Sequence, residues 1–100
     1  MEKFTLSEAF EFDGKVYNEV EYDLKSLKGV HFAEIKDAVD MIKGDATYVP
    51  AFDTRFQMHT MAKAAKLPVE FFEQLPMNDC AELCTVALVF LLNSGSQGKK

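Results

Sequence analysis

The stretch that most constrains this chain is residues 79–92, DCAELCTVALVFLL, which closely follow Pro76. A proline that is followed by Asn78 or Asp79 as the cap predicts the start of a helix. At 100° per residue, one broad apolar face results, and we expect it to contact the core. This face comprises Cys80, Leu83, Cys84, Val86, Ala87, Phe90 and Leu91.

The opposite side of this predicted helix should be polar, and only part of it is. Polar and apolar residues share that side: Glu82, Thr85 and Asn93, and also Leu88, Val89 and Leu92. A surface helix of a small acidic protein needs no second apolar patch within its own chain. We therefore predict that Leu88, Val89 and Leu92 contact a partner. Burial of these residues under the N-terminal hairpin, or against a second copy of the chain, is an equally weighted alternative.

Length and composition limit the classes of function. The chain of 100 residues fits a single domain, and its 48% hydrophobic content with nine Phe is ample for one core. The net charge of −5 argues against nucleic acid and against an anionic membrane surface as partners. The apolar runs are too short to span a membrane, and no signal peptide is recognisable. Together with the two cysteines, these features predict a reducing cytoplasm as the site of action.

Two N-terminal stretches have the alternation of half-buried strands. Apolar residues recur at even positions in both stretches: Phe4, Leu6, Phe10 and Phe12, then Val16, Val20, Tyr22 and Leu24. Asp13-Gly14 lies between them and predicts a hairpin. Because both strands carry apolar residues at even positions, we expect an odd-length loop that has Gly14 as a left-handed bulge residue.

The rest of the chain predicts helices separated by proline and glycine. The spacing of Phe32, Ile35, Val39 and Ile42 predicts an amphipathic helix over 30–43 that ends at Gly44. Residues 51–66 predict a central helix with two apolar sides. Leu67-Pro68 and Leu75-Pro76 then set off a short helix, 69–74, from the long one. We thus predict an α+β domain, residues 1–93, in which an N-terminal antiparallel β-hairpin packs against three main α-helices and one short helix. Residues 94–100 are predicted to be a flexible polar tail.

Catalytic and metal-binding patterns are weak. Cys80, Cys84 and His59 could be imagined as zinc ligands, but the paired cysteine knuckles of structural zinc sites are absent. His31 and His59 have no evident nucleophile nearby in sequence, and no glycine-rich phosphate loop is present. We therefore predict a protein that is not an enzyme and that has no cofactor and no metal.

The order of the motifs nevertheless resembles a known family. The series begins with FEFDGKVY at 10–17 and continues through Leu27-Lys28-Gly29, Pro50, AKAAKLP at 62–68, Leu75-Pro76, Asp79 and Phe90-Leu91. It is similar to that of the small tail assembly chaperones of long-tailed bacteriophages and related prophages. The resemblance extends from Phe4 to Leu92, and the order and spacing of the motifs carry it.

The resemblance implies a non-enzymatic role in the host cytoplasm. Such proteins coat the long, aggregation-prone tape measure protein until tail tube subunits polymerise around it, and they are absent from the mature virion. Many are also made in a longer, frameshifted form. The resemblance therefore implies the tape measure protein as partner, with the longer form, the tail tube protein and a homo-oligomer as further possibilities. Two alternatives stay open: a structural tail component, such as a tube or connector subunit, and a small regulatory protein that binds a host partner.

Overall fold

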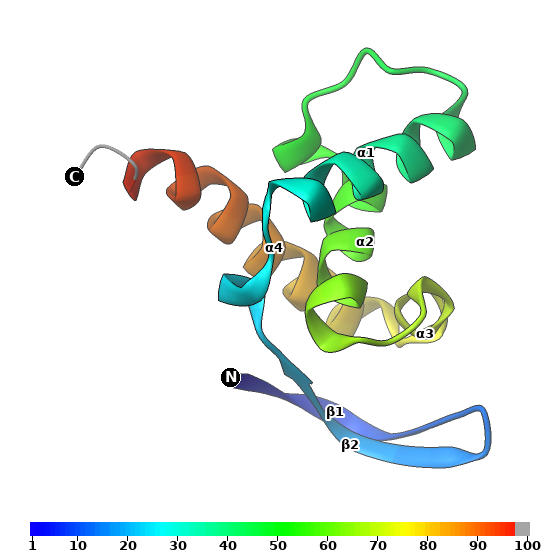
Figure 1. Ribbon diagram of the computed structural model, residues 1–100. Helices are drawn as coiled ribbons and strands as arrows, with labels where there is room; N and C mark the ends of the chain where they lie inside the picture. The colour runs from blue at the N-terminus through cyan, green and yellow to red at the C-terminus, as the bar shows by residue number, and fades with distance from the viewer. Residues whose placement is uncertain (98–100) are drawn as a thin grey trace.

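The structure is α+β, as the sequence predicts: an antiparallel β-hairpin is followed by helices that pack against it (Figure 1). The computed structural model describes the backbone of residues 1–97 and the side chains of residues 1–93. Over these residues the elements are β1 (Glu2–Phe12), β2 (Lys15–Tyr22), α1 (Gly29–Lys43), α2 (Thr54–Ala65), α3 (Val69–Gln74) and α4 (Met77–Gln97). Two 3₁₀ turns, η1 (Leu24–Ser26) and η2 (Pro50–Phe52), precede α1 and α2.

The hairpin turn is shorter than the odd-length loop that the sequence predicts. Phe12 pairs with Lys15, so Asp13 and Gly14 alone form the turn, with φ angles of 55° and 79°. Two successive residues at positive φ are typical of a type I′ turn, whose twist matches that of the strands and which favours Asp-Gly. The prediction of an odd-length bulged loop is therefore wrong.

A long bulge in β1 changes the register away from the turn. Between the Phe10–Tyr17 pair and the Thr5–Glu19 pair, β1 contains residues 6–9 whereas β2 contains only Asn18. As a result, the apolar face near the turn uses Tyr17 in place of Val16, which is exposed. Beyond the bulge, even-numbered residues pair with even-numbered ones, as expected from the alternation.

The turn half of the hairpin packs on α3 through aromatic rings. Phe71 of α3 is fully buried. The rings of Phe10, Phe12 and Tyr17 meet it edge-on, with ring centroids 5.2, 5.3 and 4.8 Å away. Edge-to-face pairs contribute about 0.5–1.5 kcal/mol each beyond the burial of their area. This cluster explains how a helix of only six residues can hold the end of the hairpin.

The bulge also ties the hairpin to α4 through one buried carboxylate. The Ser7 N–H donates to both carboxylate oxygens of Asp79 at 3.2 Å, and the Ser7 hydroxyl donates to one of them at 2.9 Å. Asp79 is only 3% exposed and lies in the first turn of α4, where the helix dipole favours a negative charge. The helix begins at Met77, so Asp79 is not its cap; its carboxylate binds β1 instead.

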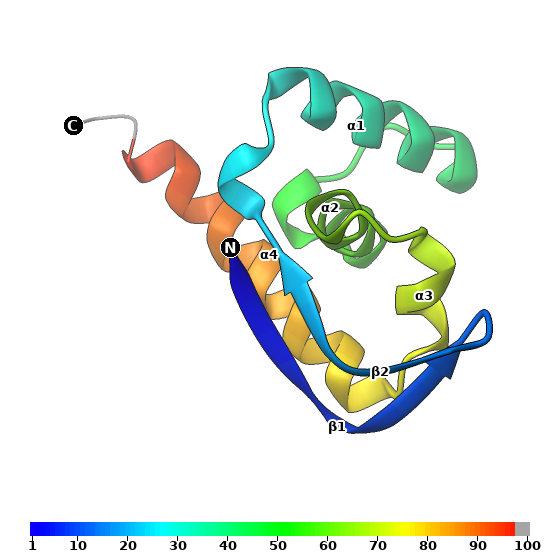
Figure 2. The ribbon, with the colours of Figure 1, turned by 60° about the horizontal axis from the view of Figure 1, so that its bottom comes forward.

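The helix α2 lies at the centre of the helical part. Figure 2 looks almost along α2 and shows α1, α3, α4 and the hairpin arranged around it, in agreement with the central position that the sequence predicts. Asp53 caps α2 by accepting the Phe56 N–H at 2.9 Å, so α2 begins at Thr54 and not at residue 51. The turn η2 takes up the residues before it.

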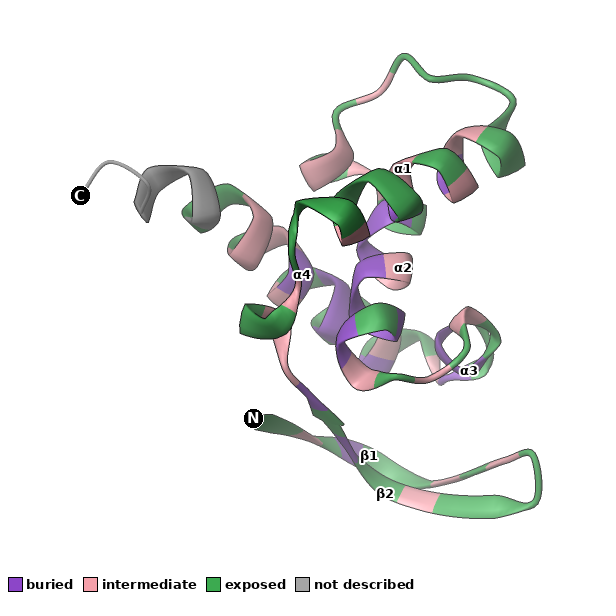
Figure 3. Ribbon diagram, in the orientation of Figure 1, coloured by how far each residue is buried: buried purple, intermediate pink, exposed green. Residues whose placement is uncertain are grey.

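Buried residues form two clusters (Figure 3). The larger cluster lies between the hairpin, α2, α3 and the first half of α4. The smaller one consists of Ile35, Val39 and Phe56, with Tyr48 and Leu91 packed against it. The helix α1 ends at Gly44, whose φ of 67° is left-handed, as predicted. Its remaining predicted core residues, Phe32 and Ile42, are about half exposed, because few described elements cover α1.

The long helix extends beyond the predicted end at residue 92 and reaches Gln97. Of the tail predicted to be flexible, residues 98–100 lie outside the described residues, as do the side chains from residue 94. The flexibility of residues 94–100 therefore stays a prediction.

Replacing Asp79 by Ala should destabilise the fold by about 2–3 kcal/mol, because the Ser7 N–H and hydroxyl lose a charged acceptor that is itself buried. Urea unfolding followed by circular dichroism measures this change. Asn78→Ala, an exposed change on the same helix turn, should alter stability by less than about 0.5 kcal/mol. Equal stability of the Asp79 and Asn78 variants would contradict a structural role for this carboxylate.

Candidate partner-binding surface

The helix α4 is much longer than the helix it packs against. Its 21 residues span about 31 Å, whereas the 12 residues of α2 span about 18 Å. The C-terminal half of α4 consequently projects past the hairpin and α2 (Figure 1). Leu83 and Ala87 in the first half are buried, but Phe90 and Leu91, one turn further on, are only half-buried.

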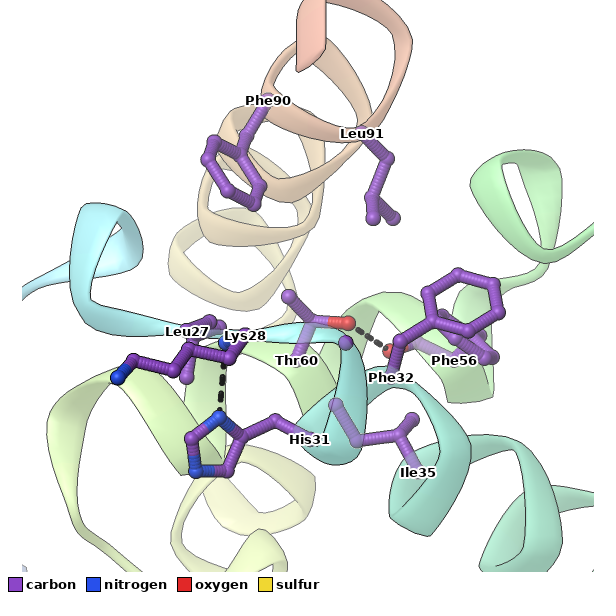
Figure 4. A pocket seen from close by; sticks show the side chains of 10 residues that line it. Leu27, Lys28, His31, Phe32, Ile35, Phe56, Thr60, Phe90 and Leu91 are labelled. Atoms are coloured by element: carbon purple, nitrogen blue, oxygen red, sulfur yellow. Dashed lines mark hydrogen bonds between the residues drawn. The ribbon is translucent and has the colours of Figure 1, made fainter. Parts of the chain in front are cut away.

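An apolar groove opens where α4 leaves the body of the protein. Its apolar lining, which defines the groove hereafter, is Leu27, Phe32, Ile35, Phe56, Phe90 and Leu91. The volume of the groove is about 340 Å³. Figure 4 shows that Phe90 and Leu91 come from α4, Phe32 and Ile35 from α1, and Phe56 and Thr60 from α2. Three helices thus contribute to one concave apolar surface.

Two of the polar side chains in the groove, those of Thr60 and His31, are already hydrogen-bonded within the protein. The Thr60 hydroxyl donates to the Phe56 carbonyl oxygen at 2.7 Å. Nδ1 of His31 accepts the Lys28 N–H at 2.8 Å and so helps to start α1 (Figure 4). Neither arrangement provides an activated nucleophile or a base aimed at a bound molecule. The groove therefore offers apolar contact more than chemistry.

The three residues predicted to bind a partner lie on the projecting half of α4. Val89 and Leu92 are 49% and 48% exposed, and Leu88 is half-buried. Val89 lines a separate hollow with Met1 and Leu24. The structure therefore does not bury all three in the core, and their contact with a partner stays a prediction.

Sequence analysis missed the groove because it assigned Phe90 and Leu91 to the core. Periodicity correctly places them on the inner face of α4, but it cannot tell that no other element fully covers that face. A signal was available in the excess of apolar residues on this helix, because Leu88, Val89 and Leu92 already exceeded what one core-facing side requires. Phe32 was likewise assigned to the core side of α1, and it is 44% exposed.

The candidate metal ligands give no metal site in the part of the chain that the structure describes. No three His, Cys, Asp or Glu side chains gather there closely enough to hold an ion. Cys80 and Cys84 are free thiols one turn apart on α4. The Cys84 thiol donates a hydrogen bond to the Cys80 sulfur, which lowers the pKa of Cys80 to about 7 and raises the pKa of Cys84.

Cys80 should therefore react first with iodoacetamide, and its rate should rise through a pH near 7, below the range of an ordinary thiol. Mass spectrometry of alkylated peptides over a pH series measures the midpoint. Cys84→Ala removes the hydrogen-bond donor and should move the midpoint upward. A midpoint that is the same in the variant would rule out the thiol pair as the cause.

His59 of α2 provides a prediction on pH. Burial lowers the pKa of His59, and its Nε2 atom is buried with no hydrogen-bond partner in the described structure. In the unfolded chain the His59 imidazole binds a proton below about pH 6.5, whereas the folded protein disfavours the protonated imidazole. The stability of the fold should therefore fall as the pH drops below about 6.5. Urea unfolding at pH 7.5 and pH 5.5 tests this. His59→Gln should flatten the dependence, and an unchanged slope would show that another group causes it.

No helix in the described part of the chain has the length and apolar character needed to cross a membrane. Comparison with known proteins finds no match among family models, curated proteins or solved structures.

Proposed function

We propose that this protein is a phage tail assembly chaperone that binds and solubilises the tape measure protein during tail morphogenesis. The observation that carries the proposal is the uncovered apolar surface of the projecting half of α4, where Val89 and Leu92 are about half exposed. The identity of the client in this proposal comes from the resemblance of the motif order to that of small tail assembly chaperones. In this role the protein acts in the host cytoplasm, performs no catalysis and is absent from the mature virion.

The physical basis is the covering of one apolar helix by another. A tape measure protein is long, helical and apolar, and it aggregates unless its apolar stripe is covered. An exposed apolar stripe on α4 can pair with such a helix at the spacing by which helices dock in grooves. The net charge of −5 would keep the resulting complex soluble through mutual repulsion. The binding residues in this proposal are Leu88, Val89 and Leu92.

Co-expression with the tape measure protein tests the proposal. The client should remain in the soluble fraction and co-purify with this chain, and it should precipitate when expressed alone. Detection of this chain in purified virions would instead identify a structural tail component. Capture of a host protein, with no effect on the tape measure protein, would identify a regulator.

Val89→Asp should reduce recovery of the soluble client about tenfold or more, because a carboxylate would enter an apolar contact. The fold should remain cooperative, since Val89 is half exposed. Met41→Asp is a matched control, because Met41 is an exposed apolar residue on α1. It introduces the same charge and should leave recovery unchanged. If Val89→Asp unfolds the protein, Val89 belongs to the core and the site is wrongly placed.

A further inference from the structure

The apolar groove contains no carboxylate, although the chain is acidic. Of the 100 residues, 16 are Asp or Glu. None of them lines the groove, whereas the basic residues Lys28 and His31 lie at its margin (Figure 4). A binding surface with this composition favours an apolar ligand that carries a negative charge at its edge.

The Lys28 ammonium group is not used within the described structure. Lys36, Lys43 and Lys63 each form an ion pair with a carboxylate at 2.8–3.0 Å. Lys28 is exposed and forms no such pair with any described residue. A cation beside an apolar hollow can pair with a carboxylate supplied from outside the chain, where partial burial strengthens the attraction.

The size of the groove fits a helix anchored by its side chains. Its volume of about 340 Å³ is at the lower end of the range of about 300–1,000 Å³ that is usual for ligand pockets. Such a space takes one or two large apolar side chains rather than a whole cofactor. Amphipathic helices use anchors of this kind, one turn apart, when they dock in a groove.

We propose that the groove binds an amphipathic helical segment of the client, with an apolar side chain between Phe32 and Leu91 and an acidic side chain beside Lys28. This proposal rests on the proposed function, and it adds a second contact region and a charge preference to it. A helix whose apolar stripe is bordered by lysines would bring like charges together and would bind more weakly.

Two synthetic amphipathic peptides test the charge preference directly. They have equal length and the same leucine stripe, which glutamates border in one peptide and lysines in the other. Binding is measured by fluorescence anisotropy at low ionic strength, where surface charges are least screened. The glutamate peptide should bind about tenfold more tightly. Equal affinities, or tighter binding of the lysine peptide, would overturn the proposal.

Variants then locate the contact. Lys28→Glu should weaken binding of the glutamate peptide about tenfold, and Phe32→Ala should weaken both peptides. Lys15→Glu is the matched control: Lys15 is also exposed, but it lies beside the hairpin turn and lines neither the groove nor the hollow at Val89. It should leave the affinity unchanged. An equal loss in the Lys15 and Lys28 variants would show a general effect of charge and would overturn the proposal.

The test also separates this proposal from its alternatives. Sedimentation could show a dimer that dissociates when the glutamate peptide is added. This result would assign the groove to a second copy of the chain and would overturn the proposal. If Lys28→Glu leaves the solubilisation of the tape measure protein unchanged, the chaperone function stands and the groove is rejected as its site. Selective peptide binding without solubilisation of the tape measure protein would support the groove chemistry and reject the chaperone function.

Discussion

One buried carboxylate joins the β-hairpin to the long helix α4. Asp79 lies in the first turn of the long helix, and its carboxylate accepts hydrogen bonds from the N–H and the hydroxyl of Ser7, which lies within the β1 bulge. A bulge leaves backbone N–H groups without cross-strand partners, and these need acceptors when they are buried. The bulge supplies the donor, and the first turn of α4 supplies the acceptor. The register of the hairpin and the position of α4 are thus fixed by the same contact.

That contact explains the distribution of apolar surface. With its N-terminal end anchored at the hairpin, α4 runs past α2 and extends beyond the other elements in the described part of the chain. The helix therefore contributes to the core at one end and exposes the apolar residues Val89 and Leu92 towards the other. In a solitary small domain, such exposure would be a liability. In a protein that covers an apolar helical client, it is the part that makes contact.

Much of the fold was predictable from local patterns, and the interactions between distant residues were not. Leu67-Pro68, Leu75-Pro76 and Gly44 marked helix boundaries correctly, because proline and left-handed glycine restrict the backbone wherever they occur. The turn was predicted wrongly because we assumed that the loop at Asp13-Gly14 determines whether even-numbered residues of the two strands pair with each other. The pairing of even-numbered residues is instead restored by the bulge in β1. Within this bulge, Ser7 bonds to Asp79, which lies 72 residues further along the chain. The groove was missed for a similar reason: hydrophobic spacing identifies the inner face of a helix but not how far its neighbours extend.

The length of α4 also gives its two halves different local stability. The first half packs against α2 and the hairpin, so we expect its amides to exchange with solvent more slowly than those further along the helix. In the segment of residues 88–93, Val89 and Leu92 are about half exposed, so less buried surface opposes local opening. Hydrogen exchange along this one continuous helix should therefore quicken from its first turn towards Leu92.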